Sequence, residues 1–271
     1  DLFWHERTNK HPMHKALNTA TRFITFHYGN TALRPLSAFP SQAQHVIPTG
    51  LPELDAALGI GGIPKGRIIE IYGPDSSGKT ALALQIVRQL QQQGVPSLYI
   101  DAEHGLSPMM LHDIDMLYAL NVDTIEDALQ ACTCAASAFG VVIIDTLAAM
   151  STRENLDLTI GEHENRPLSK VLARHLPRLF PSLQKSGCTL ILLNQIRDRV
   201  GALYGDPTTT PGGRALRYYA ALRLEVRRIE YVRHNGKIAG QRVRLKITKN
   251  SYAAPYRSAD ANLIYGKGFI P

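Results

Sequence analysis

Residues 67–80 of the chain read RIIEIYGPDSSGKT. The first part contains an apolar run, Ile68, Ile69 and Ile71, of the kind that forms a buried parallel strand. The second part, residues 73–80, matches the complete G-x-x-x-x-G-K-[ST] pattern of a phosphate-binding loop. A chance match in a glycine-rich turn is the alternative, and the strand before the loop argues against it. The chain is therefore predicted to bind a nucleoside triphosphate.

The loop contains the residue types that phosphate binding requires. Gly73 and Gly78 let the backbone curl so that its N–H groups point at phosphate oxygens. Lys79 adds a positive charge for the β- and γ-phosphates, and Thr80 offers a hydroxyl to Mg²⁺. The predicted nucleotide-binding residues of the loop are Gly73, Pro74, Asp75, Ser76, Ser77, Gly78, Lys79 and Thr80. Apolar residues at positions 83, 86, 87 and 90 predict that a helix follows at once, with its N-terminal dipole favouring the anion.

Composition limits the class of protein. The 271 residues suffice for one large α/β domain with a small appendage. A net charge of +7 favours a polyanionic partner, nucleic acid before membrane. The 3 cysteines show no paired C-x-x-C spacing, which argues against a disulfide framework and a zinc ribbon. No apolar run reaches the roughly 18 residues of a membrane span, and the first 30 residues hold no secretory signal, so a cytoplasmic protein without a membrane partner is expected.

Two further apolar runs end in carboxylates. Residues 97–101, SLYID, lead into Glu103, and residues 141–145, VVIID, end in Asp145. Catalytic side chains of parallel α/β sheets lie at the carboxyl ends of strands. Glu103 is therefore a candidate for holding an attacking water, with a solvated loop acid as the alternative. Asp145 matches the Walker-B pattern of an acid held near Mg²⁺, a pattern that also occurs by chance.

The N-terminal part is predicted to be separate from the rest. Residues 1–45 form an arm with a short helix over about 14–26, ended by Gly29-Asn30, and a proline-punctuated linker. Residues 46–271 form the core. The arm is either a loose tail or a docking helix for a neighbouring subunit.

Helix signals recur through the core. Thr49 or Gly50 is expected to cap a short helix that ends at Leu58, and Asp123-Thr124 to cap a helix over 125–137. A helix from Leu168 contains prolines 177 and 181, which predict a kink or an early stop.

Loops and strands complete the core. A buried strand is predicted over 189–193, and long polar loops over about 151–167 and 198–214 are expected to be functional because compact domains rarely contain them. Alternating residues over 222–227 and 243–248, with a turn at Asn235-Gly236, predict antiparallel strands that extend the edge of the sheet. Their basic face is either plain solvation or a binding surface.

Six segments together resemble the bacterial RecA recombinase family, in order and over about residues 13–268. They are GIGGIPKGRIIEIYGPDSSGKT (59–80), IDAEH (100–104), VVIID (141–145), LLNQIR (192–197), TTTPGG (208–213) and ALRYYAALRLEVRRI (215–229). The resemblance implies an α/β fold: a RecA-type P-loop NTPase core whose mostly parallel central sheet is flanked by helices and carries antiparallel edge strands. It also implies a DNA-dependent ATPase that forms helical filaments on single-stranded DNA and exchanges strands with homologous duplex DNA.

The resemblance also implies roles for individual residues. Lys79 and Thr80 would serve ATP phosphates and Mg²⁺, Glu103 would position water, and Asp145 would be the Walker-B acid. Gln195 would sense the γ-phosphate. Lys249 and Arg217 would reach the ATP of a neighbouring subunit, and Tyr265 and Gly266 would contact adenine. The two long loops would bind DNA, and the residues expected to meet its phosphates are Arg197, Arg199, Gly212, Gly213 and Arg214.

The chain departs from the family pattern at several positions. Ser251 stands where a second lysine is usual, which predicts slow hydrolysis because one stabiliser of phosphate charge is lost. Met110 and Ser107 replace an adenine-stacking tyrosine and a nearby aspartate, so base recognition is expected to be loose. Asn165 replaces an apolar residue of the first loop, and Pro211 a threonine of the second. The chain ends at position 271, so the family's C-terminal domain is expected to be absent.

Three functions remain open from the sequence. The first is a recombinase that forms filaments on single-stranded DNA. The second is a poorly hydrolysing paralogue that acts as a mediator for another recombinase or a repair polymerase, suggested by Ser251. The third is a P-loop hexamer acting as a helicase-like motor.

Overall fold

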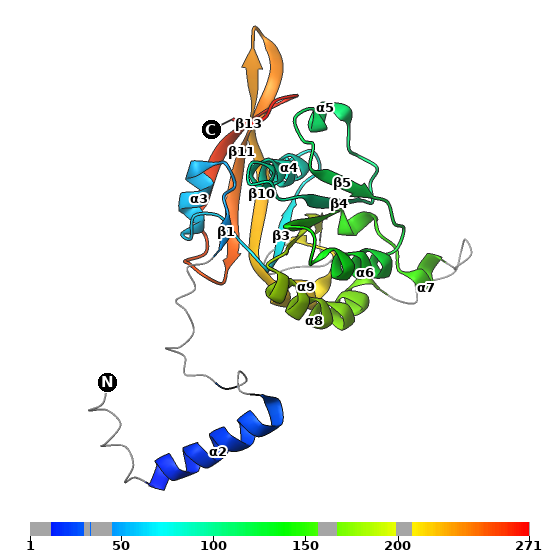
Figure 1. Ribbon diagram of the computed structural model, residues 1–271. Coiled ribbons are helices and arrows are strands. Elements are labelled where there is room, and N and C mark those ends of the chain that lie inside the picture. The colour runs from blue at the N-terminus through cyan, green and yellow to red at the C-terminus, as the bar shows by residue number, and fades with distance from the viewer. Residues whose placement is uncertain (1–11, 30–32, 34–44, 157–166, 199–207, 271) are drawn as a thin grey trace. The chain divides into compact units, whose positions relative to one another are not determined.

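The computed structural model describes residues 12–29, 33, 45–156, 167–198 and 208–270 (Figure 1). It separates the chain into two units, Asp1–Ala43 and Gln44–Pro271. In the first unit, helix α2 (Pro12–Tyr28) confirms the predicted helix and extends it by about a turn. It ends before Gly29, whose φ of 91° is the left-handed conformation that glycine adopts without cost.

A nine-stranded sheet forms the centre of the second unit. Its strands, in spatial order, are β13 (Gly268–Ile270), β12 (Ser258–Ile264), β11 (Lys237–Asn250), β10 (Ala220–His234), β3 (Ile68–Gly73), β7 (Thr189–Gln195), β6 (Val141–Asp145), β4 (Ser97–Asp101) and β5 (Leu117–Leu120). Neighbours from β10 to β5 are parallel, and neighbours from β10 to β13 are antiparallel. The predicted mostly parallel sheet with antiparallel strands is confirmed.

Helices cover both faces of this sheet (Figure 1). The longest are α4 (Lys79–Gln91), α6 (Ile125–Ala135) and α8 (Leu168–Ser186), and the shorter ones are α3 (Pro52–Leu58), α5 (Pro108–Leu111), α7 (Arg153–Leu156), α9 (Gly213–Tyr219) and the 3₁₀ turn Leu147–Ala149. Small strand pairs are β1 (Val46–Ile47) with β2 (Ile63–Pro64), and β8 (Arg197–Asp198) with β9 (Thr208–Thr209). No helix in the described ranges is long and apolar enough to cross a membrane.

The central strands are apolar on both faces because they are buried on both. Along β6, Val141 and Ile143 pack into a core with α3 and α4, whereas Val142 and Ile144 pack into a second core with α6 and α8. Alternate residues of a strand point to opposite faces. A continuous apolar run is therefore the pattern that a strand between two helix layers requires.

Helix starts and ends test the cap predictions. Thr124 caps α6 as predicted, since its hydroxyl oxygen accepts from the amide of Asp127 at 3.1 Å. The predicted cap at Thr49 or Gly50 is wrong, because Leu51 is the N-cap of α3 and makes no side-chain cap bond. The Thr49 hydroxyl instead accepts from the Leu51 amide at 3.2 Å.

One further expectation needs correction. Helix α8 continues through both prolines, 177 and 181, so the early stop is wrong. The turn at Asn235-Gly236 between β10 and β11 is confirmed. The antiparallel strands predicted to extend the sheet are confirmed as well, and β10 joins the two halves because it also pairs in parallel with β3.

A buried ion pair crosslinks these two strands. Glu70 of β3 is fully buried, and one carboxylate oxygen accepts from Nε of Arg223 on β10 at 2.5 Å. The other oxygen accepts from the side-chain amide of Asn194 on β7 at 3.0 Å. The same amide donates to the carbonyl oxygen of Pro211 at 2.8 Å, so the network also holds the end of the loop that precedes α9.

Arg223→Met should therefore destabilise the protein by about 3 kcal/mol, because it leaves the Glu70 carboxylate buried without its cation. Urea denaturation gives the measurement. Adding Glu70→Gln to that variant should recover much of the loss. Arg227→Met is the control, since its pair with Glu225 has a half-exposed arginine, and it should cost less than about 1 kcal/mol. Equal losses for the two arginine variants would show that the buried pair has no special role.

Candidate nucleotide-binding site

The predicted phosphate loop connects β3 to α4. Ser76 and Gly78 have φ of 56° and 104°, so the chain curls there as an anion-binding loop requires. Gly73 must be glycine, because a Cβ would lie 2.1 Å from the carbonyl oxygen of Val226. Lys79 is buried inside the curl, and its Nζ donates to the carbonyl oxygens of Gly73 at 3.2 Å and Pro74 at 2.8 Å.

The loop contains polar groups whose environment is unfavourable without an anion. Burial lowers the pKa of Lys79, although the carboxylates of Asp75, Asp145 and Glu103 oppose this effect. The Ser77 hydroxyl is buried and makes no hydrogen bond within the described ranges. Since buried polar groups are normally paired, this loop has the chemistry of a site completed by phosphate oxygens.

Thr80 and Asp145 meet beside the loop. The Thr80 hydroxyl donates to Oδ2 of Asp145 at 2.7 Å, and the Tyr99 hydroxyl donates to the same oxygen. Burial raises the pKa of Asp145, although these two hydrogen bonds oppose the shift. A hydroxyl and a carboxylate fit Mg²⁺, which takes oxygen ligands and keeps waters and phosphate oxygens in its shell.

A larger protein cage for a metal is not present among the described residues, which contain no cluster of three or more His, Cys, Asp or Glu side chains suited to a metal ion. Any Mg²⁺ at Thr80 and Asp145 would therefore depend on phosphate oxygens and water for its other ligands.

Glu103 lies two residues after β4, the strand that pairs with β6. Its Oε1 accepts from the Thr146 hydroxyl at 2.8 Å and from Nε2 of Gln195 at 3.1 Å. Glu103 follows β4, Thr146 follows β6 and Gln195 ends β7. The three residues therefore meet where parallel strands end at one edge of the sheet. The second oxygen of Glu103 accepts no hydrogen bond from the described residues and is available to a water.

One cavity of about 710 Å³ contains these groups. Its lining includes every predicted residue from Asp75 to Thr80, together with Glu103, Asp145, Gln195, Tyr265 and Gly266. Gly73 and Pro74 are not among the lining residues and contact Lys79 through their carbonyl oxygens. The fold thus brings into one cavity predicted residues that are up to 191 positions apart, counted from Asp75 to Gly266.

The two residues predicted to act on a neighbour lie outside this cavity. Nζ of Lys249 donates to the carbonyl oxygens of Arg217 at 2.7 Å and Tyr218 at 2.9 Å. Partial burial, followed by the nearby charge of Arg223, lowers the pKa of Lys249. Nη2 of Arg217 donates to the Thr209 hydroxyl at 2.9 Å. Both side chains are thus held near α9 rather than at the phosphate loop of their own chain.

The predicted DNA-binding residues are only partly described. Arg197 is exposed on β8, which pairs with β9, and Arg214 is exposed at the start of α9. Gly212 is buried, and a Cβ there would lie 2.9 Å from Leu216. Gly213 follows it with φ of 65°. Arg199, Asn165 and most of both long loops (157–166 and 199–207) lie outside the described residues.

Sequence reasoning missed three polar residues that line the cavity: Thr146, Arg88 and Gln241. Thr146 directly follows Asp145, the predicted Walker-B acid, so its position was a usable signal. Nε2 of Gln241 donates to the carbonyl oxygen of Ser76 at 3.1 Å across 165 positions, and no local pattern indicates such a contact.

Comparison with known proteins identifies the family. Residues 15–270 match the RecA N-terminal domain family. The chain belongs to the RecA family. It is 39% identical over 274 residues to Protein RecA of Ruminococcus albus, covering 99% of this chain and 69% of that protein. It is 40% identical to Protein RecA of Thermus thermophilus, covering 95% of this chain and 78% of that protein.

A solved structure shares the fold of this RecA-family chain. The crystal structure of the RadB recombinase aligns with a TM-score of 0.60 over 82% of this chain and 98% of that one. The sequence identity is 20%, so this likeness concerns the fold alone. The family and the fold predicted from sequence are both confirmed.

Asp145→Asn should stabilise the protein without nucleotide at neutral pH by about 1 kcal/mol, as removal of an unfavourable functional group often does. Burial raises the pKa of Asp145 in the folded state, so the wild type loses stability as pH rises from the ordinary aspartate pKa through that raised value. The advantage of the variant should therefore vanish in acid. Thermal unfolding from pH 3 to 8 tests this.

Asp123→Asn, at an exposed aspartate, is the matched control. It should have the same unfolding temperature as the wild type at each pH. A destabilised Asp145→Asn protein at pH 7 would contradict the assignment of an electrostatic cost to this carboxylate.

Proposed function

We propose that this RecA-family chain is a DNA-dependent ATPase that forms filaments on single-stranded DNA and promotes homologous pairing and strand exchange with duplex DNA. Family membership at 39% identity over 99% of the chain supports this proposal. The observation that carries it is the Glu103 carboxylate, held by Thr146 and Gln195 in the same cavity as the phosphate loop. A loop that only clamps a nucleotide does not need a carboxylate positioned to hold a water.

The proposed chemistry assigns a task to each group. Lys79 would exchange its two carbonyl partners for the β- and γ-phosphate oxygens of ATP. Thr80 and Asp145 would hold Mg²⁺, which neutralises phosphate charge. Glu103 would orient the attacking water in line with the γ-phosphate, because Thr146 and Gln195 fix one of its oxygens and leave the other for the water.

Gln195 is proposed to link the nucleotide to DNA. It contacts Glu103 and ends β7, only two residues before Arg197 and the loop over about 198–214. A γ-phosphate that drew the amide away from Glu103 would pull on the start of this loop. The proposed DNA contacts on it are Arg197, Arg199, Gly212, Gly213 and Arg214, together with the loop over about 151–167. Contacts to phosphates suit a protein that binds DNA without regard to sequence.

The filament would place each ATP between two subunits. Residues 1–45 would be the docking arm and 46–271 the ATPase core. The described part of the arm fits this role, since Phe23 and Phe26 on α2 are 61% and 86% exposed and have apolar surface to bury. Lys249 and Arg217 would leave their present carbonyl and hydroxyl partners to reach the neighbour's ATP. The proposed location is the cytoplasm.

A second function is favoured by one position. Ser251 is exposed beside Lys249 and offers no cation for the developing phosphate charge. A RecA-like paralogue that hydrolyses ATP poorly could serve as a mediator for another recombinase or a repair polymerase. The two functions differ in the turnover number and in strand exchange by the purified protein alone.

Glu103→Gln should lower DNA-stimulated ATP hydrolysis by a factor of about 10² to 10⁴ while leaving ATP binding nearly unchanged, because the amide cannot accept a proton from water. Steady-state hydrolysis with and without single-stranded DNA, and equilibrium binding of ATP, are the two measurements. Glu53→Gln, at an exposed glutamate of α3, is the control and should behave as wild type. Wild-type protein that binds DNA with ATP but shows negligible turnover would favour the mediator instead.

Ser251→Lys should raise the DNA-stimulated kcat on the order of tenfold if the recombinase mechanism operates, since it adds a cation near the proposed position of the neighbour's γ-phosphate. The backbone amide of Ser251 keeps its bond to the Ala221 carbonyl oxygen, so the fold should tolerate the change. Gln93→Lys adds the same charge at an exposed position after α4 and serves as the control. An equal response of the two variants would argue against a missing catalytic cation.

A further inference from the structure

We infer that the base end of this cavity accepts purine nucleoside triphosphates without reading the base edge, so that ATP and GTP bind with similar affinity. The inference rests on the proposed function, because it requires that the cavity binds a nucleoside triphosphate. It concerns a wall of the cavity that we call the methionine wall, formed by Met109 and Met110 of α5 opposite Tyr265 and Gly266.

Large apolar side chains gather at this wall. Met109 is 64% exposed, Met110 is 40% exposed and Tyr265 is 52% exposed, and all three line the cavity. The two sides lie close together, because a Cβ on Gly266 would be 3.3 Å from Sδ of Met109. Exposed apolar side chains that cluster around a cavity mark a place where a ligand covers them.

The methionine wall lies at the far end of α4 from the phosphate loop. Arg88, which contacts the wall, is eight residues after Thr80, a distance of about 12 Å along the helix. A triphosphate bound by Lys79 and Thr80 at the start of α4 would therefore direct its sugar and base along the helix to the methionine wall.

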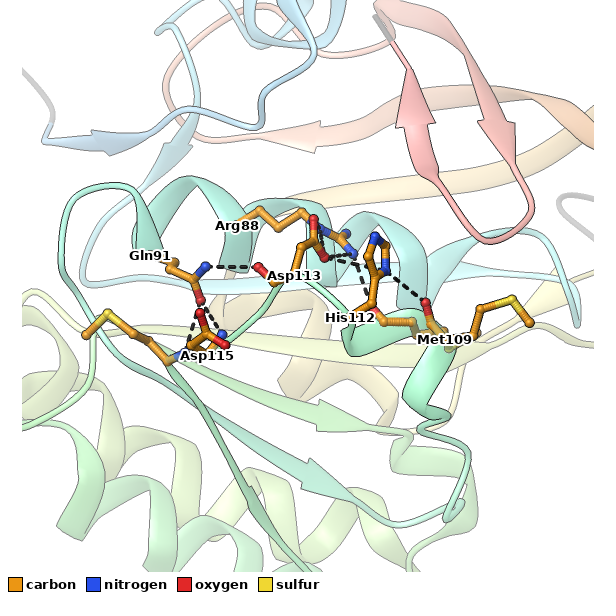
Figure 2. Close-up of polar contacts among 8 residues, drawn as sticks. Arg88, Gln91, Met109, His112, Asp113 and Asp115 are labelled. Atoms are coloured by element: carbon orange, nitrogen blue, oxygen red, sulfur yellow. Dashed lines mark hydrogen bonds and ion pairs between the residues drawn. The ribbon is translucent and has the colours of Figure 1, made fainter.

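Side chains of α4 hold the segment that follows α5 (Figure 2). Nε and Nη2 of Arg88 donate to the carboxylate of Asp113 at 2.8 to 3.0 Å. The side-chain amide of Gln91 donates to the carbonyl oxygen of Asp113 at 2.9 Å, and its oxygen accepts from the amides of Asp115 at 2.7 Å and Met116 at 3.0 Å. One helix thus positions both the phosphate loop and the methionine wall.

Several polar side-chain atoms beside the wall are already paired. Nη2 of Arg88 also donates to the carbonyl oxygen of Met110 at 3.0 Å, and Nδ1 of His112 lies 3.1 Å from that of Met109 (Figure 2). Both oxygens of Asp113 accept from Arg88. Ser107 and Tyr265 also line the cavity, but a hydroxyl donates and accepts equally well and does not distinguish two base edges.

Adenine and guanine have rings of the same size and differ in the donors and acceptors of their edges. A site that hydrogen-bonds an edge rejects the wrong partner by a factor of about 10⁴ to 10⁵, whereas an apolar pocket discriminates weakly. Methionine adapts to different shapes and is common at surfaces with several ligands. The methionine wall should therefore bind both purines through contact area and exclude neither.

The test is competition of unlabelled ATP, GTP and inorganic triphosphate, each with Mg²⁺, against a fluorescent ATP analogue. The inference predicts that the dissociation constants of ATP and GTP agree within about tenfold and that inorganic triphosphate binds more weakly than both. A preference for ATP greater than tenfold overturns it. Failure of the wild type to bind any of the three, or unchanged binding in Lys79→Ala, would instead overturn the proposed function.

Variants separate the wall from the phosphate loop. Met109→Ala combined with Met110→Ala should weaken ATP and GTP equally, on the order of tenfold, and leave inorganic triphosphate unchanged. Arg88→Gln should have the same signature, because Arg88 is a positioning residue for the wall. Arg244→Gln breaks a comparable arginine–aspartate pair with Asp260, away from the cavity, and should change none of the three. Loss of ATP alone in the methionine variant, with GTP retained, would overturn the inference.

Discussion

The parallel register of four central strands is the constraint on which the rest of the structure depends. Asp101 of β4 is paired with Asp145 of β6, and Gly73 of β3 with Gln195 of β7. One strand cannot slide by itself in this sheet. A shift by one residue would turn each of its side chains from one helix layer to the other and disrupt the packing of both layers. The register that buries the core therefore also aligns the strand ends.

The candidate nucleotide-binding site depends on this alignment. The phosphate loop leaves β3, Glu103 follows β4, Asp145 ends β6 and Gln195 ends β7, so four segments distant in sequence deliver polar groups to one edge. The antiparallel extension from β10 to β13 adds the opposite wall of the cavity with Tyr265 and Gly266. A cleft between parallel strand ends and an added wall is the usual position for a ligand in an open α/β sheet.

Several polar groups of the candidate site lie in an environment that is unfavourable without a bound anion. Burial lowers the pKa of Lys79 and raises that of Asp145, and the Ser77 hydroxyl is buried without a hydrogen bond among the described residues. Such groups cost stability, which the two apolar cores supply. The buried Glu70–Arg223 pair differs from them because each partner satisfies the other, and it connects the parallel and antiparallel halves of the sheet. Its link to Pro211 through Asn194 joins the sheet to the loop proposed to bind DNA.

The sequence by itself determined the local elements and the chemistry they carry. The phosphate loop, the strands over 97–101 and 141–145 and the cap at Thr124 are decided by neighbouring residues, so their patterns could be read directly. Only the tertiary structure decided which distant side chains meet. The contact of Gln241 with Ser76, the pair of Arg223 with Glu70 and the bond of Arg88 to Met110 join residues that share no pattern. Packing also overrode local signals at Thr49 and at the prolines of α8, because burial of a whole helix face outweighs a single cap or a missing amide.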